Sequence, residues 1–99
     1  MRERQLRSWR ELRRAIEGLE HDEGIRIEAP LKVLRRRSYV FISRSDGTYI
    51  VNRTERVYDR RLRGFVPGGK EEWAFFDDPA QLLLHINQNF RRPLKAWIY

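Results

Sequence analysis

The sequence contains no cysteine, a single methionine and no long apolar segment among its 99 residues. The lack of cysteine excludes disulfide bonds, thiolate zinc sites and thiol nucleophiles, and it fits a reducing compartment. No apolar run approaches the roughly 20 residues that span a bilayer, and the charged N-terminus lacks the apolar core of a signal peptide. We therefore expect a soluble, cytoplasmic protein.

Lysine is also scarce, because 18 of the 21 basic residues are arginine. With 14 acidic residues, the formal net charge is +7 and the pI is near 10.5. A guanidinium is always charged, grips phosphate through two parallel hydrogen bonds and stacks on flat rings. A GC-rich genome would raise the ratio of arginine to lysine, but it would not produce the excess of positive charge. A polyanion is therefore the first partner to consider.

The N-terminal segment predicts a helix, because apolar residues recur there at every third or fourth position. These residues are Leu6, Trp9, Leu12, Ile16 and Leu19. Ser8 and Glu11 have the spacing of a capping box, and Gly18 or Gly24 would end the helix.

A β-hairpin is the clearest local feature of the sequence. Segments 39–44 and 48–53 flank the dipeptide Asp46-Gly47, which favours a type I′ turn with positive φ at both residues. This turn sets the register. The predicted opposed pairs are Ser45 with Thr48, Arg44 with Tyr49, Ile42 with Val51, and Val40 with Arg53.

The hairpin has two chemically different faces, since successive side chains of a strand alternate. The face expected to pack under the helices carries Val40, Ile42, Tyr49 and Val51, with Arg44 and Arg53 at its rim. The other face carries Arg35, Arg37, Tyr39, Phe41, Ser43, Ile50, Asn52 and Thr54. Aromatic rings among arginines are typical of a platform that stacks unpaired bases.

The remaining elements complete one α+β domain over residues 1–99. Short strands are predicted at 25–27, 31–37, 57–62, 73–76 and 94–99, and the glycine-rich stretch 64–69 is predicted as a loop. Asp78 and Pro79 suit the N-cap and first position of a second helix. Its buried stripe would be Leu82, Leu83, Ile86 and Phe90, which leaves Leu84 exposed. We expect a small antiparallel β-sheet of four to six short strands, flanked by an N-terminal and a C-terminal helix, with a short terminal strand.

No catalytic motif is complete. Gly64 to Lys70 matches the phosphate-loop spacing, but Glu71 stands where a hydroxyl should bind magnesium. The octamer of RNA-recognition domains also begins correctly at Arg63, but Pro67 interrupts it.

The two histidines, His21 and His85, have no metal-ligand spacing, and His85 is expected at the boundary of the second helix's apolar stripe. We therefore expect no metal, no cofactor and no catalytic residue.

Positive charge is concentrated in the strand region. From Arg26 to Arg63 the chain has eleven basic and four acidic residues, a net charge of +7. Aromatic residues are interleaved with this charge. The predicted nucleic-acid-binding residues are Arg35, Arg36, Arg37, Tyr39, Phe41, Arg44, Asn52, Arg53, Tyr58, Arg60, Arg61 and Arg63. The expected function is non-catalytic binding of single-stranded DNA or RNA, with arginines on phosphates and rings on bases.

Two other classes of function remain open at this stage. One is a small basic protein-interaction module, of the viral or mobile-element type, that docks on an acidic partner. The other is a metal-independent, toxin-like ribonuclease that recruits Tyr58, Arg60, Arg61 and His85. A homodimer through Leu84 or the 94–99 strand is compatible with each class.

Overall fold

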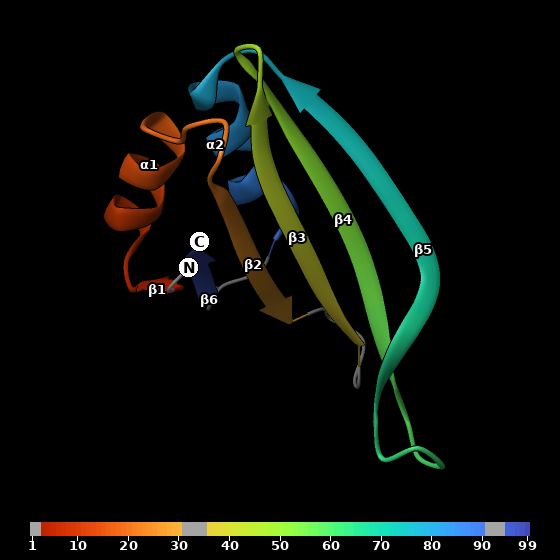
Figure 1. Cartoon of the computed structure of the whole chain (residues 1–99). Coiled ribbons are helices and arrows are strands. Elements are labelled where there is room, and N and C mark those ends of the chain that lie inside the picture. Colours follow the sequence, from red (N-terminus) through yellow and green to blue (C-terminus); the bar gives the residue numbers. More distant parts are fainter. Residues whose placement is uncertain (1–2, 31–35, 91–94) are drawn as a thin grey trace.

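The computed structural model describes residues 3–30, 36–90 and 95–99. The chain forms an α+β domain with an antiparallel sheet and two helices, as the sequence predicts (Figure 1). The elements are β1 (Arg4–Leu6), α1 (Trp9–Glu17), β2 (Gly24–Pro30), β3 (Arg36–Ser45), β4 (Thr48–Asp59), β5 (Gly64–Phe76), α2 (Pro79–Asn89) and β6 (Lys95–Ile98). Within the described residues the sheet has six strands in the order β1-β6-β2-β3-β4-β5, and neighbouring strands run antiparallel.

Both helices cover the same face of the sheet, and the core lies between them and the strands (Figure 1). The buried strand residues include Ile25 and Ile27 of β2, and all four predicted inward residues of the hairpin are buried too. Opposed residues share a face. The pairs Ile25–Ile42 and Ile42–Val51 therefore place one continuous apolar layer under the helices.

Helix α1 is shorter than the apolar spacing predicts. Ser8 is the N-cap, as expected, and its Oγ accepts from the Glu11 amide at 3.1 Å. Gly18 is the C-cap. Leu6 lies before the helix in β1 and Leu19 lies after it, yet both are buried with the helical stripe. The prediction of one helix over all five residues was wrong at both ends. Leu6 and Leu19 face the core from a strand and a loop, and their spacing happens to continue the helical pattern of apolar residues.

The β3–β4 hairpin confirms the predicted turn and register. Asp46 and Gly47 have φ of 50° and 82°, as a type I′ turn requires. All four predicted pairs are present, and the ladder continues as far as Arg36 opposite Val57.

The predictions of a separate strand at 57–62 and a loop at 64–69 were both wrong. Strand β4 continues without a break to Asp59, and β5 begins at Gly64. Between the pairs Thr54–Glu71 and Arg56–Pro67, β4 has one residue and β5 has three, so the extra residues form a bulge. Gly69 lies in that bulge with φ of 84°. The sheet accepts a proline and glycines here because β5 is an edge strand, whose outward amides need no partner.

Strand β6 lies inside the sheet. It pairs with β1 through Trp97–Gln5 and with β2 through Trp97–Arg26. The terminal strand that the sequence predicts is therefore present from Lys95. The predicted strand at 31–37 lies partly outside the described residues, and its described part belongs to β3.

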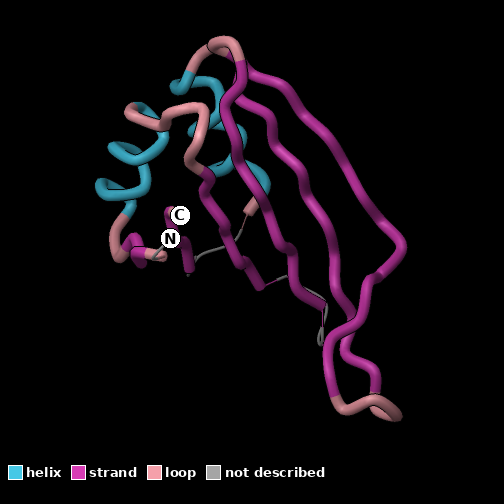
Figure 2. Tube along the Cα trace, in the orientation of Figure 1, coloured by secondary structure: helices cyan, strands magenta, loops and turns pink. Residues whose placement is uncertain are grey.

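The β4–β5 hairpin extends well beyond the helices (Figures 1 and 2). The molecule measures 42 × 25 × 24 Å. The strands β3, β4 and β5 have 10, 12 and 13 residues, so the prediction of uniformly short strands was wrong.

The hydroxyl of buried Tyr49 connects the sheet to α1, because it donates to the Ile16 carbonyl at 2.8 Å. Replacing Tyr49 by Phe removes this hydrogen bond and leaves the ring in place. We expect the free energy of unfolding to fall by about 1 kcal/mol, as measured by urea denaturation. Tyr58→Phe removes a hydroxyl from a side chain at the surface and should leave the stability unchanged; equal losses for the two variants would contradict the role of Tyr49.

Candidate nucleic-acid interface

The face of the sheet opposite the helices carries a continuous row of cross-strand neighbours. The strand register aligns Gln5, Trp97, Arg26, Phe41, Asn52 and Trp73. Directly opposed side chains project to the same side of a sheet. The alternation that buries Ile42 and Val51 therefore places this row on the open face, as the sequence predicts for Phe41 and Asn52.

Two aromatic side chains of edge strand β5 are the most exposed rings of this face. Trp73 is 59% exposed and Phe75 is 64% exposed. Their neighbours toward the middle of the sheet, Asn52 and Ile50, are half-buried. Tyr39 and Phe41, the two rings that the sequence places here, are also half-buried.

Arginines stack on rings where the open face approaches the β4–β5 tip. The guanidinium of Arg56 lies 5.1 Å from the ring centre of Tyr39, and that of Arg37 lies 5.0 Å from the ring centre of Phe65. The ring of Tyr58 meets Phe65 edge-on at 5.6 Å. Both arginines are exposed, and neither has a carboxylate at ion-pair distance among the described residues. They retain the capacity to bind phosphate.

Arg26 is already neutralised. Its guanidinium lies 3.1 Å from a Glu3 oxygen and 3.9 Å from a Glu28 oxygen, and it stacks on Trp97 at 4.7 Å. This arginine holds β1, β6 and β2 together, so phosphate affinity at that end of the face is low. Carboxylates also occur elsewhere on the face, since Asn52 donates to Glu71 at 2.8 Å.

Arg44 belongs to the helix-covered side of the sheet, as the sequence analysis places it. Its guanidinium lies 4.9 Å from the Tyr49 ring centre and donates to the Leu19 carbonyl at 3.1 Å. The structure does not bring Arg44 together with Tyr39 and Phe41.

Arg53 occupies the same side. Its Nε donates to the Ser38 hydroxyl at 3.2 Å, and its terminal nitrogens lie 3.7 Å from oxygens of Glu55 and Glu72. The ring of Phe90 lies 5.3 Å away. Arg53 therefore stabilises the contact between the sheet and the end of α2 and is separate from the open face.

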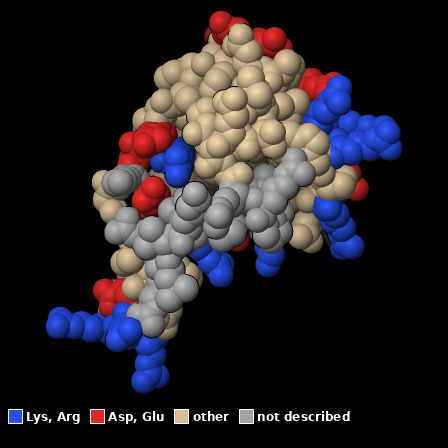
Figure 3. Space-filling view, turned by 180° about the vertical axis from the view of Figure 1, so that it is seen from behind, with Lys and Arg blue, Asp and Glu red and all other residues tan. Residues whose placement is uncertain are grey.

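Three predicted arginines lie at the tip of the β4–β5 hairpin. Arg60, Arg61 and Arg63 are exposed there, and Figure 3 shows basic side chains gathered at this extremity. Arg35 lies outside the described residues, as does the side chain of Arg36.

The predicted set lacked several residues of the open face: Arg56, Phe65, Trp73 and Phe75. For Trp73 and Phe75, the alternation of side chains along the predicted strand 73–76 was a signal that could have found them. Ala74 pairs with inward-facing Val51, so its neighbours Trp73 and Phe75 must face outward. No such signal indicated the face on which Phe65 lies, because the segment 64–69 is predicted as a loop.

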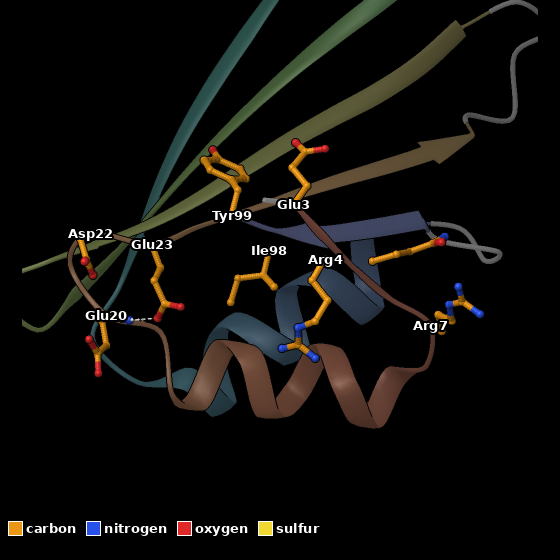
Figure 4. Close-up of a pocket in the computed structure, with 9 residues that line it drawn as sticks. Glu3, Arg4, Arg7, Glu20, Asp22, Glu23, Ile98 and Tyr99 are labelled. Atoms are coloured by element: carbon orange, nitrogen blue, oxygen red, sulfur yellow. Dashed lines mark hydrogen bonds between the residues drawn. The ribbon is translucent and has the colours of Figure 1, made fainter. Parts of the chain in front are cut away.

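A separate hollow of about 980 Å³ opens between the α1–β2 loop and strands β1 and β6 (Figure 4). Glu20, Asp22 and Glu23 line one side of it, and Arg4 lies across from them. Three carboxylates repel phosphate, so this hollow is a poor nucleic-acid site. Among the residues that the structure describes, no group of His, Asp or Glu side chains has an arrangement that could hold a metal ion.

His85 is distant from the arginines with which a ribonuclease would pair it. His85 belongs to α2, and its ring lies 5.1 Å from that of Phe76 and 6.2 Å from that of Phe90. Arg60 and Arg61 lie beyond the helices, at the hairpin tip (Figure 1). The structure does not assemble this candidate catalytic set.

Comparisons with protein-family models, with curated proteins and with solved structures find no significant match to this chain. Neither α1 nor α2, the helices formed by the described residues, has the length and apolar character needed to cross a membrane.

Burial lowers the pKa of His85 below its ordinary value of 6.5, Arg53 lowers it further, and Glu72 partly opposes both. The folded protein therefore binds this proton less tightly than the unfolded chain does. We expect the free energy of unfolding to fall as the pH drops below 6.5, measured by urea denaturation at several pH values. His85→Gln should flatten this dependence, whereas His21→Gln, which removes an exposed histidine, should retain it; an unchanged slope in His85→Gln would contradict the assignment.

Proposed function

We propose that the chain binds single-stranded nucleic acid, DNA or RNA, on the open face of its sheet, without catalysing a reaction. One observation carries the proposal. Exposed Trp73 and Phe75 share a sheet face with Arg37 and Arg56, and no described carboxylate neutralises either of these exposed arginines.

The two groups would perform different tasks. Unpaired bases stack on exposed rings with little regard to sequence, and each stacked base contributes about 1–3 kcal/mol. Arginines bind the phosphates between those bases and release counterions, which makes the affinity depend on salt. The half-buried rings of Tyr39 and Phe41 extend the platform toward the centre of the sheet.

A second candidate function is protein binding through α2. Apart from His85, no residue of α2 is acidic or basic, and Leu84 on this helix is 56% exposed. An uncharged helix with a prominent leucine suits a protein contact, including a homodimer. Strand β6 is less suited to a dimer, because its backbone pairs with β1 on one side and β2 on the other.

Replacing Trp73 by Ala should weaken binding of a fluorescent single-stranded oligonucleotide by about 5- to 150-fold, the equivalent of one lost stack. Phe75→Ala should have a similar effect. Trp73→Phe retains a flat ring and should recover most of the affinity. Fluorescence anisotropy with DNA and RNA probes measures these changes, and the affinity should fall steeply between about 50 and 200 mM salt.

Leu84→Ala is the matched control, because it removes an exposed apolar side chain from a helix on the other side of the sheet. It should leave the affinity unchanged. The proposal fails if the wild-type protein shows no binding at low salt, or if Leu84→Ala weakens binding as much as Trp73→Ala does. A Leu84→Ala variant that changes the mass measured by light scattering would support the second candidate.

A further inference from the structure

The tip of the β4–β5 hairpin differs from the open face in its chemistry. It consists of Arg60, Arg61, Leu62 and Arg63, between the last strand pair Asp59–Gly64. Leu62 is 72% exposed. No aromatic residue belongs to these four positions, so the tip has cations and an aliphatic side chain but no ring on which an unpaired base could stack.

The backbone of the tip is organised by Asp59. Its Oδ1 accepts from the amides of Arg61 at 2.8 Å and Leu62 at 3.2 Å. The one carboxylate of the tip is thus engaged with backbone amides. Among the described residues, no carboxylate lies at ion-pair distance from any of the three guanidinium groups.

Arg63 adopts a φ of 52°, a left-handed conformation that favours glycine or asparagine. Long side chains are rarely held in this region, and residues that are held there cluster at binding sites. The turn also leaves Arg63 exposed beside the other two arginines. Its side chain is therefore one of three exposed guanidinium groups at the far end of the hairpin (Figure 1).

We propose that this tip is a second binding site, for duplex DNA. The major groove of B-form DNA is wide enough to admit a two-stranded β-ribbon. The hairpin is such a ribbon, and it projects free of the helices (Figures 1 and 2). Inserted there, the three arginines lie against the phosphates on either side of the groove, and Leu62 contacts the methyl groups that thymines present in it. The deep, narrow major groove of duplex RNA does not admit the ribbon.

The two sites are adjacent along the same strands. Asp59 lies seven positions along β4 from Asn52, the neighbour of Trp73, which corresponds to about 23 Å. Arg56 and Arg37 lie between them. A duplex that continues into a single strand would occupy the tip and the open face together. This preference for a junction rests on the proposed function, whereas the duplex site itself does not.

The decisive variant is Arg60→Ala/Arg61→Ala/Arg63→Gly, in which glycine suits the positive φ at position 63. The probe is a fluorescent blunt DNA duplex about two helical turns long, titrated at several salt concentrations. Each lost phosphate contact reduces the slope of log affinity against log salt by about 0.9. We expect the slope to fall by about 2 to 3, with a large loss of affinity at low salt.

The matched control is Arg7→Ala/Arg10→Ala/Arg14→Ala, which removes the same charge from exposed positions at and before α1. It should retain most of the duplex affinity. Leu62→Ser should weaken duplex binding several-fold without changing the salt slope, because it removes a groove contact and no charge. Circular dichroism and thermal unfolding confirm that each variant is folded.

Three results would overturn the duplex site: no duplex binding by the wild-type protein at low salt, equal losses in the two triple variants, or equally effective competition by polyglutamate. The last would indicate an acidic protein as the partner of the tip. Duplex binding that depends on the tip, together with no binding of single strands, would refute the proposed function and leave this site standing. Single strands that bind equally well to the tip variant and to the matched control confirm that the two sites are separate.

Discussion

Alternation of side chains across one antiparallel sheet is the constraint on which the rest of this molecule depends. Both helices cover a single face, and the apolar layer that includes Ile25, Ile42 and Val51 is buried beneath them. A shift of register by one residue would send this layer to solvent, so the Asp46-Gly47 turn also determines which residues are left outside. The proposed binding surface is in this sense a consequence of the core. Phe41 and Asn52, for example, lie on the open face because their strand neighbours Ile42 and Val51 are buried.

The long edge strand β5 allows the β4–β5 hairpin to extend beyond the helix-covered part of the sheet. Edge strands tolerate proline and bulges, and the bulge around Gly69 lets β5 follow β4 far beyond the helices. The extension has little of the core beneath it, so cross-strand contacts such as Tyr58 against Phe65 support it. The same extension carries the cationic tip away from the body, where a large polyanion can reach it from several sides.

Charge and structure divide the arginines into two groups. Arg26, Arg44 and Arg53 make contacts with carboxylates, carbonyls or buried rings and hold elements together. Others, such as Arg37 and Arg61, are exposed and have no carboxylate partner among the described residues. The net charge of +7 is therefore unevenly distributed, because arginines near the sheet centre are paired whereas those of the hairpin tip have no described carboxylate at ion-pair distance. Such unequal placement would direct a polyanion toward one end of the molecule.

The sequence by itself determined the α+β class, the hairpin register and the N-cap of α2 at Asp78, because turn chemistry and capping act between residues close in the chain. It also placed Tyr39 and Phe41 on the outward face. Only the tertiary structure decided that β6 lies between β1 and β2, since that pairing joins the two ends of the chain. It also decided that the stretch 64–69 is a strand. Proline and glycine signal a loop locally, but pairing with the whole length of β4 outweighs that preference at a sheet edge. The same long-range pairing brought Arg37 onto Phe65, which no local pattern of the chain could specify.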